Sequence, residues 1–254
     1  MTSQPTLIVI QHIDREGPDL IGDCAKELGM KIQTIRPDRW ESLPDPISTE
    51  NTIAVLLGGP MSVQDRHSAP FAWLQKELEW LTQWHEHKYP VLGICLGAQL
   101  LAVAAGGTVH SLQLGMPSHP IKEVGFGAIH WLTEPISEPL LKGMNPSELV
   151  LHWHGDRIRL PATATLMGSS LQCEEQVFRI DEHALGLQCH LEVRMTNLER
   201  WILEDHNYIL SALGADGPNR LRQDSERFGD VLERQGRLFI SNALSYLSAS
   251  TKKI

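Results

Sequence analysis

The chain has 254 residues, of which 42% are hydrophobic, and its 31 acidic and 22 basic residues give a formal charge of -9. This length is enough for one or two domains with a substantial core, and we expect one larger domain. Because the charge is acidic and no block of lysine or arginine forms a phosphate-binding stripe, nucleic acid is not expected as a partner.

The first residues, MTSQPTLIVIQHID, predict a strand rather than a targeting segment, since the apolar run is short and no basic residues precede it. No stretch approaches the about 20 apolar residues that cross a bilayer, so no membrane association is expected. The 4 cysteines show no CxxC spacing, which argues against a disulfide framework and a zinc ribbon. We therefore expect a reducing, cytoplasmic setting.

The next elements alternate along the chain. Apolar runs predict strands over 6–12, 52–59 and 89–95, and helical spacing predicts helices over 19–29 and 71–87. Such alternation predicts an α/β fold with a single doubly wound, largely parallel sheet flanked by helices. The Pro-rich segment 42–49 is interpreted as a loop. Further strands predicted over 121–132, 148–156 and 184–193 have little helix between them, so the sheet is expected to become mixed.

The C-terminal quarter changes to helix. Apolar residues recur at helical spacing over 197–213 and 226–248, with a Gly/Asp/Pro break at 214–219. We expect one domain over 1–195 and a C-terminal helical extension, 196–254, packed on the same domain.

One short pattern, GICLG, places Cys95 between a strand and an alanine-rich helix. This is the context of a nucleophile elbow, in which a side chain at 93 or 97 would collide with neighbouring backbone, so glycine is required. The N–H groups and dipole at the start of the following helix favour the thiolate over the thiol. A buried structural cysteine is the alternative, but pattern and context together favour a nucleophile.

A cysteine nucleophile needs a base, and the base needs an orienting group. In ALGLQCHLEV the apolar residues alternate with polar ones, so a strand would place His190 and Glu192 on one face. Glu192 could then accept a hydrogen bond from one ring nitrogen of His190 while the other nitrogen faces the sulfur. A solvent-facing polar alternation is the competing interpretation, and the elbow upstream makes it less favoured.

Two other segments are rich in glycine or histidine. LLGGPMSV lacks the Gly-Lys-Ser/Thr of a phosphate loop, and its Gly59 amide suits an oxyanion hole shared with the amide of Leu96. HWHGDR, with His154 and Asp156, resembles the metallo-β-lactamase signature, but Arg157 stands where that signature has histidine. We expect no metal and no cofactor.

Taken together, GGPMSVQD, GICLGAQLLAVAAGG, HWHGDRI and LGLQCHLEV resemble the class I (triad) glutamine amidotransferases, especially the stand-alone GMP-synthase-like group. The resemblance covers about residues 6–195 and implies a flavodoxin-like fold. The residues that it implies for the site are the triad Cys95, His190 and Glu192, the oxyanion hole at Gly59 and Leu96, and a glutamine pocket that includes Gly58, Gln99, His154 and Asp156. One departure is Leu191, where the family usually has proline; a residue there points away from the catalytic pair, so the geometry should survive.

The resemblance implies an amidohydrolase that cleaves the side-chain amide of glutamine or a γ-glutamyl compound through a cysteinyl thioester, releasing glutamate and ammonia or amine. No nucleotide-binding loop follows residue 196, so the chain would either supply ammonia to a synthase subunit or hydrolyse independently. A catalytically silent scaffold or binding subunit is the third alternative. The order of histidine before the acid distinguishes the chain from the dienelactone hydrolases.

Overall fold

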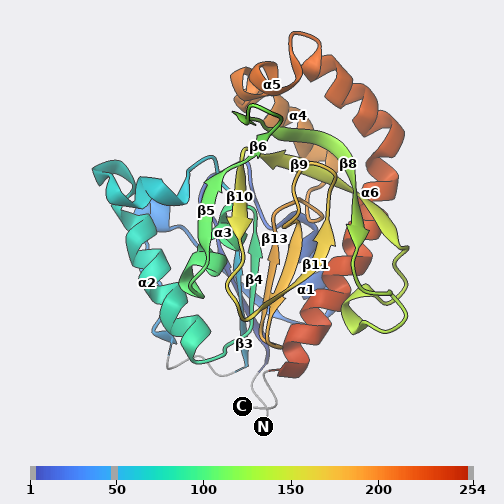
Figure 1. The fold of residues 1–254 in the computed structure, drawn as a ribbon. Coiled ribbons are helices and arrows are strands. Elements are labelled where there is room, and N and C mark those ends of the chain that lie inside the picture. The colour runs from blue at the N-terminus through green and yellow to red at the C-terminus, as the bar shows by residue number, and fades with distance from the viewer. Residues whose placement is uncertain (1–3, 47–50, 251–254) are drawn as a thin grey trace.

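The computed structural model describes residues 4–46 and 51–250, and within these ranges the chain builds one mixed sheet (Figure 1). The strands of this sheet are β1 (Thr6–Ile10), β2 (Lys31–Ile35), β3 (Thr52–Leu56), β4 (Val91–Ile94), β8 (Glu123–Trp131), β9 (Ser147–His154), β11 (Ala164–Ser169), β12 (Val177–Ile180) and β13 (Ala184–Leu187). Their spatial order is β2-β1-β3-β4-β13-β12-β11-β8-β9. The five strands from β2 to β13 run parallel, and the pairings beyond β13 are antiparallel.

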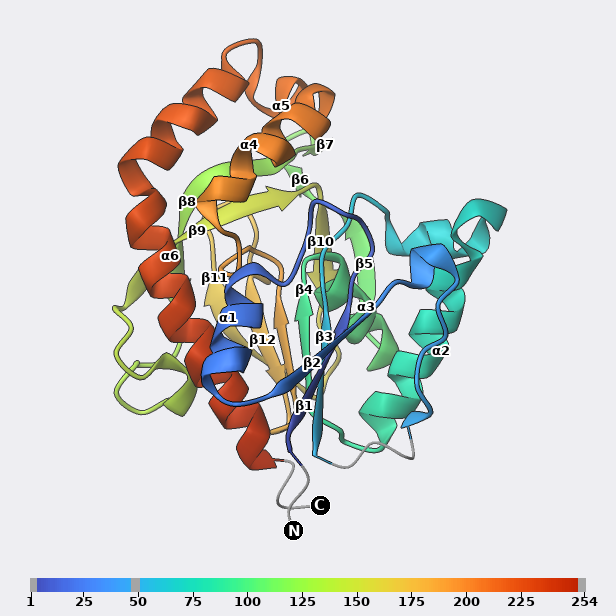
Figure 2. The same cartoon turned by 180° about the vertical axis from the view of Figure 1, so that it is seen from behind.

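Helices cover both faces of the sheet, as the alternation of strands and helices predicted. Helices α1 (Asp19–Glu27) and α6 (Gly217–Ser250) lie on one face, and α2 (Ala72–Glu86) and α3 (Leu96–Ala104) lie on the other (Figure 2). The side chains of β1 alternate accordingly, because Leu7 and Val9 join the core under α1 and α6 whereas Ile8 and Ile10 join the core under α2 and α3. The mixed, doubly wound α/β fold is therefore confirmed.

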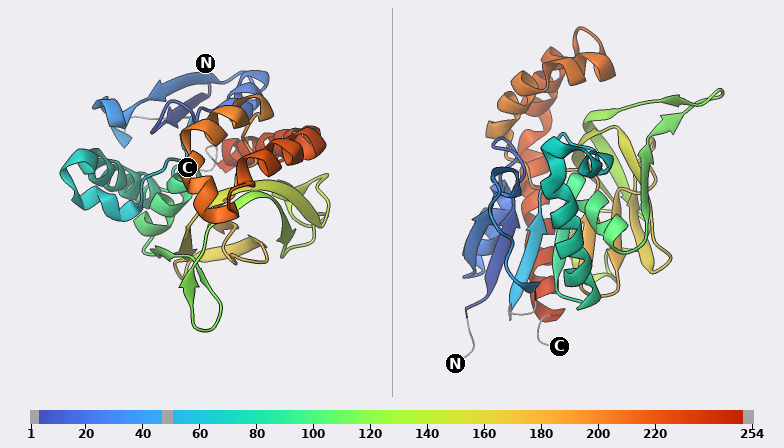
Figure 3. Two further views of the ribbon diagram at one scale, coloured as in Figure 1. Left: turned by 90° about the horizontal axis from the view of Figure 1, so that it is seen from above. Right: turned by 90° about the vertical axis from the view of Figure 1, so that its left-hand side faces the viewer.

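Two small ribbons extend the antiparallel half. Strand β5 (Thr108–Ser111) pairs with β10 (Asp156–Arg159), and β6 (Gln113–Leu114) pairs with β7 (His119–Pro120). The β6–β7 ribbon projects from the body as an arm, seen edge-on in Figure 3. The short 3-10 helices are η1 (Pro37–Arg39), η3 (Val63–His67), η4 (Ala69–Phe71) and η5 (Pro139–Leu141).

The C-terminal helices close the end of the sheet at which β4 and β13 finish. Helices α4 (Met195–Glu204) and α5 (His206–Leu213) share an apolar cluster with β9, in which Trp201 packs edge-on against Trp153. Helix α6 then runs for 34 residues along the sheet and α1. It begins at Gly217, so the break predicted over 214–219 is shorter, because proline is favoured in the first turn of a helix.

The structure differs from the sequence expectation in three segments. The strand predicted over 184–193 ends at Leu187; beyond it, His190 forms an isolated antiparallel bridge with Leu151 of β9. Strand β2 was not predicted, because KIQTI is too polar to indicate a buried strand. In the predicted loop 42–49 no regular element precedes residue 46, and residues 47–49 lie outside the described ranges. No helix of the described residues is long and apolar enough to span a bilayer.

Candidate active site

Cys95 stands between β4 and α3 on a turn that the backbone holds in an unusual conformation. Its φ of 48° lies in the left-handed region, which residues with a side chain rarely adopt. A Cβ at Gly93 would lie 2.5 Å from the carbonyl oxygen of Gly97, and one at Gly97 would lie 2.2 Å from that of Leu56. The collision predicted for these two positions is confirmed, and the geometry is that of a nucleophile elbow.

His190 lies beside the elbow in the segment that follows β13. Its Nδ1 is 2.7 Å from Oε1 of Glu192, and both side chains are buried. Backbone hydrogen bonds with Leu151 fix the segment, since His190 N donates to Leu151 O at 2.8 Å and Leu151 N donates back at 3.1 Å. The histidine is therefore held both by its ring and by its backbone.

The electrostatics of His190 favour the imidazolium. Burial alone would lower its pKa, but the charge of Glu192, the hydrogen bond with Cys95 and the hydrogen bond with Glu192 outweigh burial, and the pKa stands well above its usual value. A protonated ring next to a thiol can stabilise negative charge on the sulfur and later supply a proton to a leaving group.

The glycine loop after β3 lies over the elbow. A Cβ at Gly59 would be 3.3 Å from Cδ2 of Leu96, and one at Gly58 would be 3.3 Å from Cε1 of His190. Nδ1 of His12 donates to the Gly58 carbonyl oxygen at 3.0 Å, and Nε2 of the same ring donates to Oε1 of Glu77 at 2.9 Å. Burial lowers the pKa of His12, but Glu77 and Gly58 raise it further, so a charged and buried histidine anchors the loop.

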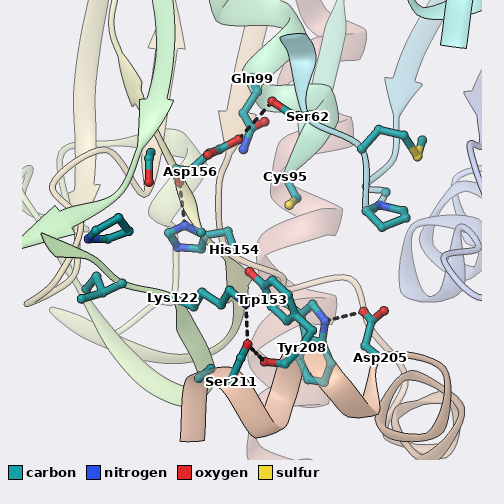
Figure 4. A pocket seen from close by; sticks show the side chains of 18 of the residues that line it. Ser62, Cys95, Gln99, Lys122, Trp153, His154, Asp156, Asp205, Tyr208 and Ser211 are labelled. Atoms are coloured by element: carbon teal, nitrogen blue, oxygen red, sulfur yellow. Dashed lines mark hydrogen bonds between the residues drawn. The ribbon is translucent and has the colours of Figure 1, made fainter. Parts of the chain in front are cut away.

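The elbow opens into a cavity of about 720 Å³. Figure 4 shows Cys95 facing this space across from Trp153, Asp205 and Tyr208. Gln99, His154 and Asp156, three of the residues expected in a glutamine pocket, also line it. Nδ1 of His154 donates to the carbonyl oxygen of Asp156 at 2.8 Å.

Of the other expected residues, Gly59, Cys95 and His190 line the same cavity. Gly58, Leu96 and Glu192 do not, because they stand one layer behind it. The geometry thus brings all of the expected residues to one end of the sheet, whereas their chemical roles stay predictions.

Several residues of the site were not found in the sequence. Gln188 donates from Nε2 to Sγ of Cys95 at 3.5 Å, and Glu16 is 6% exposed on the cavity wall, where burial raises its pKa. From α5, Tyr208 lines the cavity; Asp205, just before α5, accepts from Arg15 at 2.6 Å and from Trp153 at 2.8 Å. Only the alternation in ALGLQCHLEV could have indicated Gln188; the others come from distant segments.

A cysteine elbow on a mixed sheet, backed by a histidine and a glutamate two residues apart, defines the class of triad amidotransferases. The sequence model of the family described as glutamine amidotransferase class-I matches residues 19–209. The chain belongs to this family. The match runs through α4 into α5 and so passes the boundary expected at 195.

Relatives with known sequences match over much of the chain. The glutamine amidotransferase-like protein YfeJ of Salmonella typhimurium is 29% identical over 191 residues, which are 75% of this chain and 77% of that protein. A glutamine-hydrolysing GMP synthase of Natranaerobius thermophilus is 32% identical over 164 residues, 64% of this chain but only 28% of its own length. The match therefore spans little more than a quarter of that synthase.

Solved structures match over nearly the whole chain. A glutamine amidotransferase from Thermotoga maritima superposes with a TM-score of 0.80 at 26% identity and covers 96% of this chain and 99% of its own. One from Methylobacillus flagellatus also gives 0.80, at 25% identity, and covers 96% and 94%. The C-terminal helices thus lie within the matched structure.

Proposed function

We propose that this chain hydrolyses the side-chain amide of glutamine or of a γ-glutamyl compound through a thioester on Cys95. The observation that carries the proposal is the placement of Cys95 on a strained elbow that faces the cavity, next to a histidine whose second nitrogen is held by Glu192. Membership of the amidotransferase family supports glutamine amide hydrolysis in general.

The proposed reaction has two halves. The Cys95 sulfur attacks the amide carbon, the carbon–oxygen π pair moves onto oxygen, and the N–H groups of Gly59 and Leu96 stabilise that oxyanion. The tetrahedral intermediate collapses, the carbon–nitrogen bond breaks, and His190 gives its proton to the departing nitrogen. His190 then takes a proton from water, which attacks the thioester, and the carbon–sulfur bond breaks to release a γ-carboxylate.

Independent hydrolysis is favoured over dependence on a synthase. A loop that waited for a partner would need freedom at Gly58, but here its carbonyl is fixed by the buried His12–Glu77 pair. The cavity, at about 720 Å³, is also near the upper part of the about 300–1,000 Å³ range of drug-sized ligand sites. Both features support a γ-glutamyl substrate with a bulky leaving group.

A synthase-coupled glutaminase is the second candidate. It is favoured by one further relative, a separate glutamine-hydrolysing subunit of the GMP synthase of Methanoculleus marisnigri, which is 34% identical over 125 residues. These residues are 48% of this chain and 62% of that relative. Under this proposal the chain alone would turn over slowly, and a co-purifying partner would restore the rate. A silent scaffold would leave all substrates untouched.

The test is a panel of glutamine and γ-glutamyl amides and peptides incubated with the purified full chain, with Cys95→Ala as the blank. We expect release of ammonia or amine above that blank for at least one γ-glutamyl compound without any partner. Silence on every panel member, relieved by a co-purified synthase, would favour the second candidate.

The nucleophile is tested separately by covalent labelling. A glutamine-like diazo ketone should modify Cys95 and spare the three other cysteines, Cys24, Cys173 and Cys189, all of which are buried. Burial raises the pKa of the Cys173 thiol to about 12 and that of Cys189 well above its usual value, so neither is a competing thiolate. Peptide mass mapping that places the label on another cysteine contradicts the assignment.

A further inference from the structure

A second cluster of buried polar side chains lies behind the cavity wall, on the paired strands β8 and β9. Glu123 of β8 is directly opposite His154 of β9, and His152 is on the same face two residues before it. Their exposed fractions are 8%, 3% and 3%, respectively. One ligand-type atom from each of the three lies within 4.8 Å of the others.

The ring of His154 is oriented in an informative way. Its Nδ1 is 2.8 Å from the carbonyl oxygen of Asp156, which can only accept, so Nδ1 carries a proton. In the neutral ring Nε2 then offers a lone pair, yet it lies 3.1 Å from Oε2 of Glu123, another acceptor. Two acceptors at this distance require a positive centre, either a proton or a cation.

The same orientation is usual for histidines that bind metal ions, which donate the second ring N–H to a carbonyl or a carboxylate while the first nitrogen coordinates. In His154 the backbone of Asp156 supplies that outer partner. The Asp156 side chain is turned away from the cluster, because one of its oxygens accepts from Ser62 at 3.5 Å. The metal-like pattern noticed in HWHGD thus involves a different carboxylate from the one in the pattern.

His152 provides an independent sign of a ligand. Both of its ring nitrogens are buried without a hydrogen-bond partner in the described part of the chain. Burial, the largest influence, lowers the pKa of this histidine to about 4, so its ring is neutral at physiological pH. A buried and unpartnered imidazole is costly, since a lost hydrogen bond is worth about 1–3 kcal/mol, unless something binds it.

Gln176, in the turn before β12, closes the remaining side of the cluster. Its Nε2 lies 2.7 Å from Oε2 of Glu123 and 3.3 Å from Nε2 of His154, while its Oε1 is buried without a partner among the described residues. Turning the carboxamide over would present Oε1, a ligand atom, to the same point. A fourth ligand is therefore available without any backbone change.

We propose that Glu123, His152, His154 and Gln176 form a binding site for a divalent transition-metal ion of the zinc type. Two histidines and one glutamate are a known zinc donor set, and tetrahedral ligands at about 2.0–2.1 Å lie about 3.4 Å from one another. Oε2 of Glu123 is 3.1 Å from Nε2 of His154 and 3.6 Å from Nδ1 of His152, on either side of that value. The sequence favoured no metal because Glu123 comes from another strand.

Occupancy would act on the cavity through His154, which both lines the cavity and belongs to the cluster. An ion would replace the proton between His154 and Glu123 and fix β8, β9 and the turn before β12 to one another. The site is thus structural or regulatory and lies outside the reaction at Cys95.

The experiment uses the full chain, stripped with a chelator and dialysed against Zn²⁺, with Co²⁺ as a spectroscopic probe. We expect one equivalent of Zn²⁺, visible bands of four-coordinate Co²⁺ with nitrogen and oxygen ligands, and a rise in unfolding temperature when Zn²⁺ is added. His152→Leu, which keeps an apolar group of similar extent, should weaken binding at least tenfold and abolish the temperature rise. Glu123→Gln should do the same.

The matched control is His183→Asn, which alters the other close histidine pair of the molecule, since His183 and His85 lie 3.0 Å apart without a carboxylate between them. This variant should bind Zn²⁺ as the unaltered chain does. The proposal is overturned if the stripped chain takes up no Zn²⁺ at micromolar concentration, if His152→Leu binds it equally well, or if Co²⁺ shows a thiolate charge-transfer band. Should Glu123→Gln fail to fold, His152→Leu alone decides.

Discussion

The C-terminal helix should control the active site from a distance, and Gly236→Ala is the substitution that tests this. A Cβ built on Gly236 of α6 lies 2.0 Å from the carbonyl oxygen of Leu191, the residue between His190 and Glu192. Because this is a backbone atom, no side-chain rotation can make room. Either α6 or the segment that carries the catalytic pair has to move.

The size of the effect follows from the distances. Ordinary contact begins at 3.4 Å, so the two backbones must separate by about 1.4 Å from the present 2.0 Å. A misplacement of about 1 Å in a catalytic group can cost about 100-fold in rate. Overpacking costs about 1–3 kcal/mol in stability, and the better helix propensity of alanine returns about 1 kcal/mol. We therefore expect a modest loss of stability with a large loss of activity.

Gly229→Ala is the matched control on the same helix. Its Cβ would lie 2.7 Å from Cγ of Met195, a flexible side chain that can move aside. Both variants are compared by the rate of Cys95 labelling, by turnover of the best panel substrate and by thermal unfolding. Gly229→Ala should react within a few-fold of the unaltered chain, and Gly236→Ala about 100-fold more slowly although folded. Equal rates for the two variants would refute the idea that α6 positions His190.

Three further predictions concern the pair, the pH dependence and the cavity wall. His190→Ala should nearly abolish turnover, and Glu192→Gln added to it should cost little more, whereas multiplicative losses would contradict a coupled pair. His183, whose pKa is lowered to about 4 chiefly by burial, takes up its proton more readily when unfolded, so stability falls as pH falls below about 6.5; between pH 7 and 5 urea unfolding should show about 2 kcal/mol more loss for the unaltered chain than for His183→Asn, and equal losses would contradict this. Asp205→Asn should raise KM about tenfold with little change in kcat, because its hydrogen bonds to cavity residues hold the wall, and an unchanged KM would argue against that role.

The parts of the fold that could be predicted are those that short segments determine. The strands around 6–12, 52–59 and 89–95 are apolar and bounded by turn residues, and all three are present as β1, β3 and β4. The elbow at Cys95 was equally accessible, because the collision that requires its glycines involves backbone within or next to the pattern.

Long-range contacts were not predictable in this way. Arg15 and Asp205 meet across 190 residues of sequence, and Glu123 meets His154 because β8 and β9 pair antiparallel in one particular register. Register depends on which strands become neighbours, and no single segment contains that information. The division into 1–195 and 196–254 stays a prediction.

The contact between Gly236 and Leu191 also bears on how the molecule comes into being. The elbow can form once the first hundred or so residues have been made, but the helix that supports His190 ends only at Ser250. Phe239, Ile240 and Leu244 of that helix fill the same core as β1 and β3. A chain still emerging from the ribosome therefore contains the thiol without its fixed partner. Its hydrolytic capacity should appear only with the last turns of α6, which spares other amides in the cell from an unfinished catalyst.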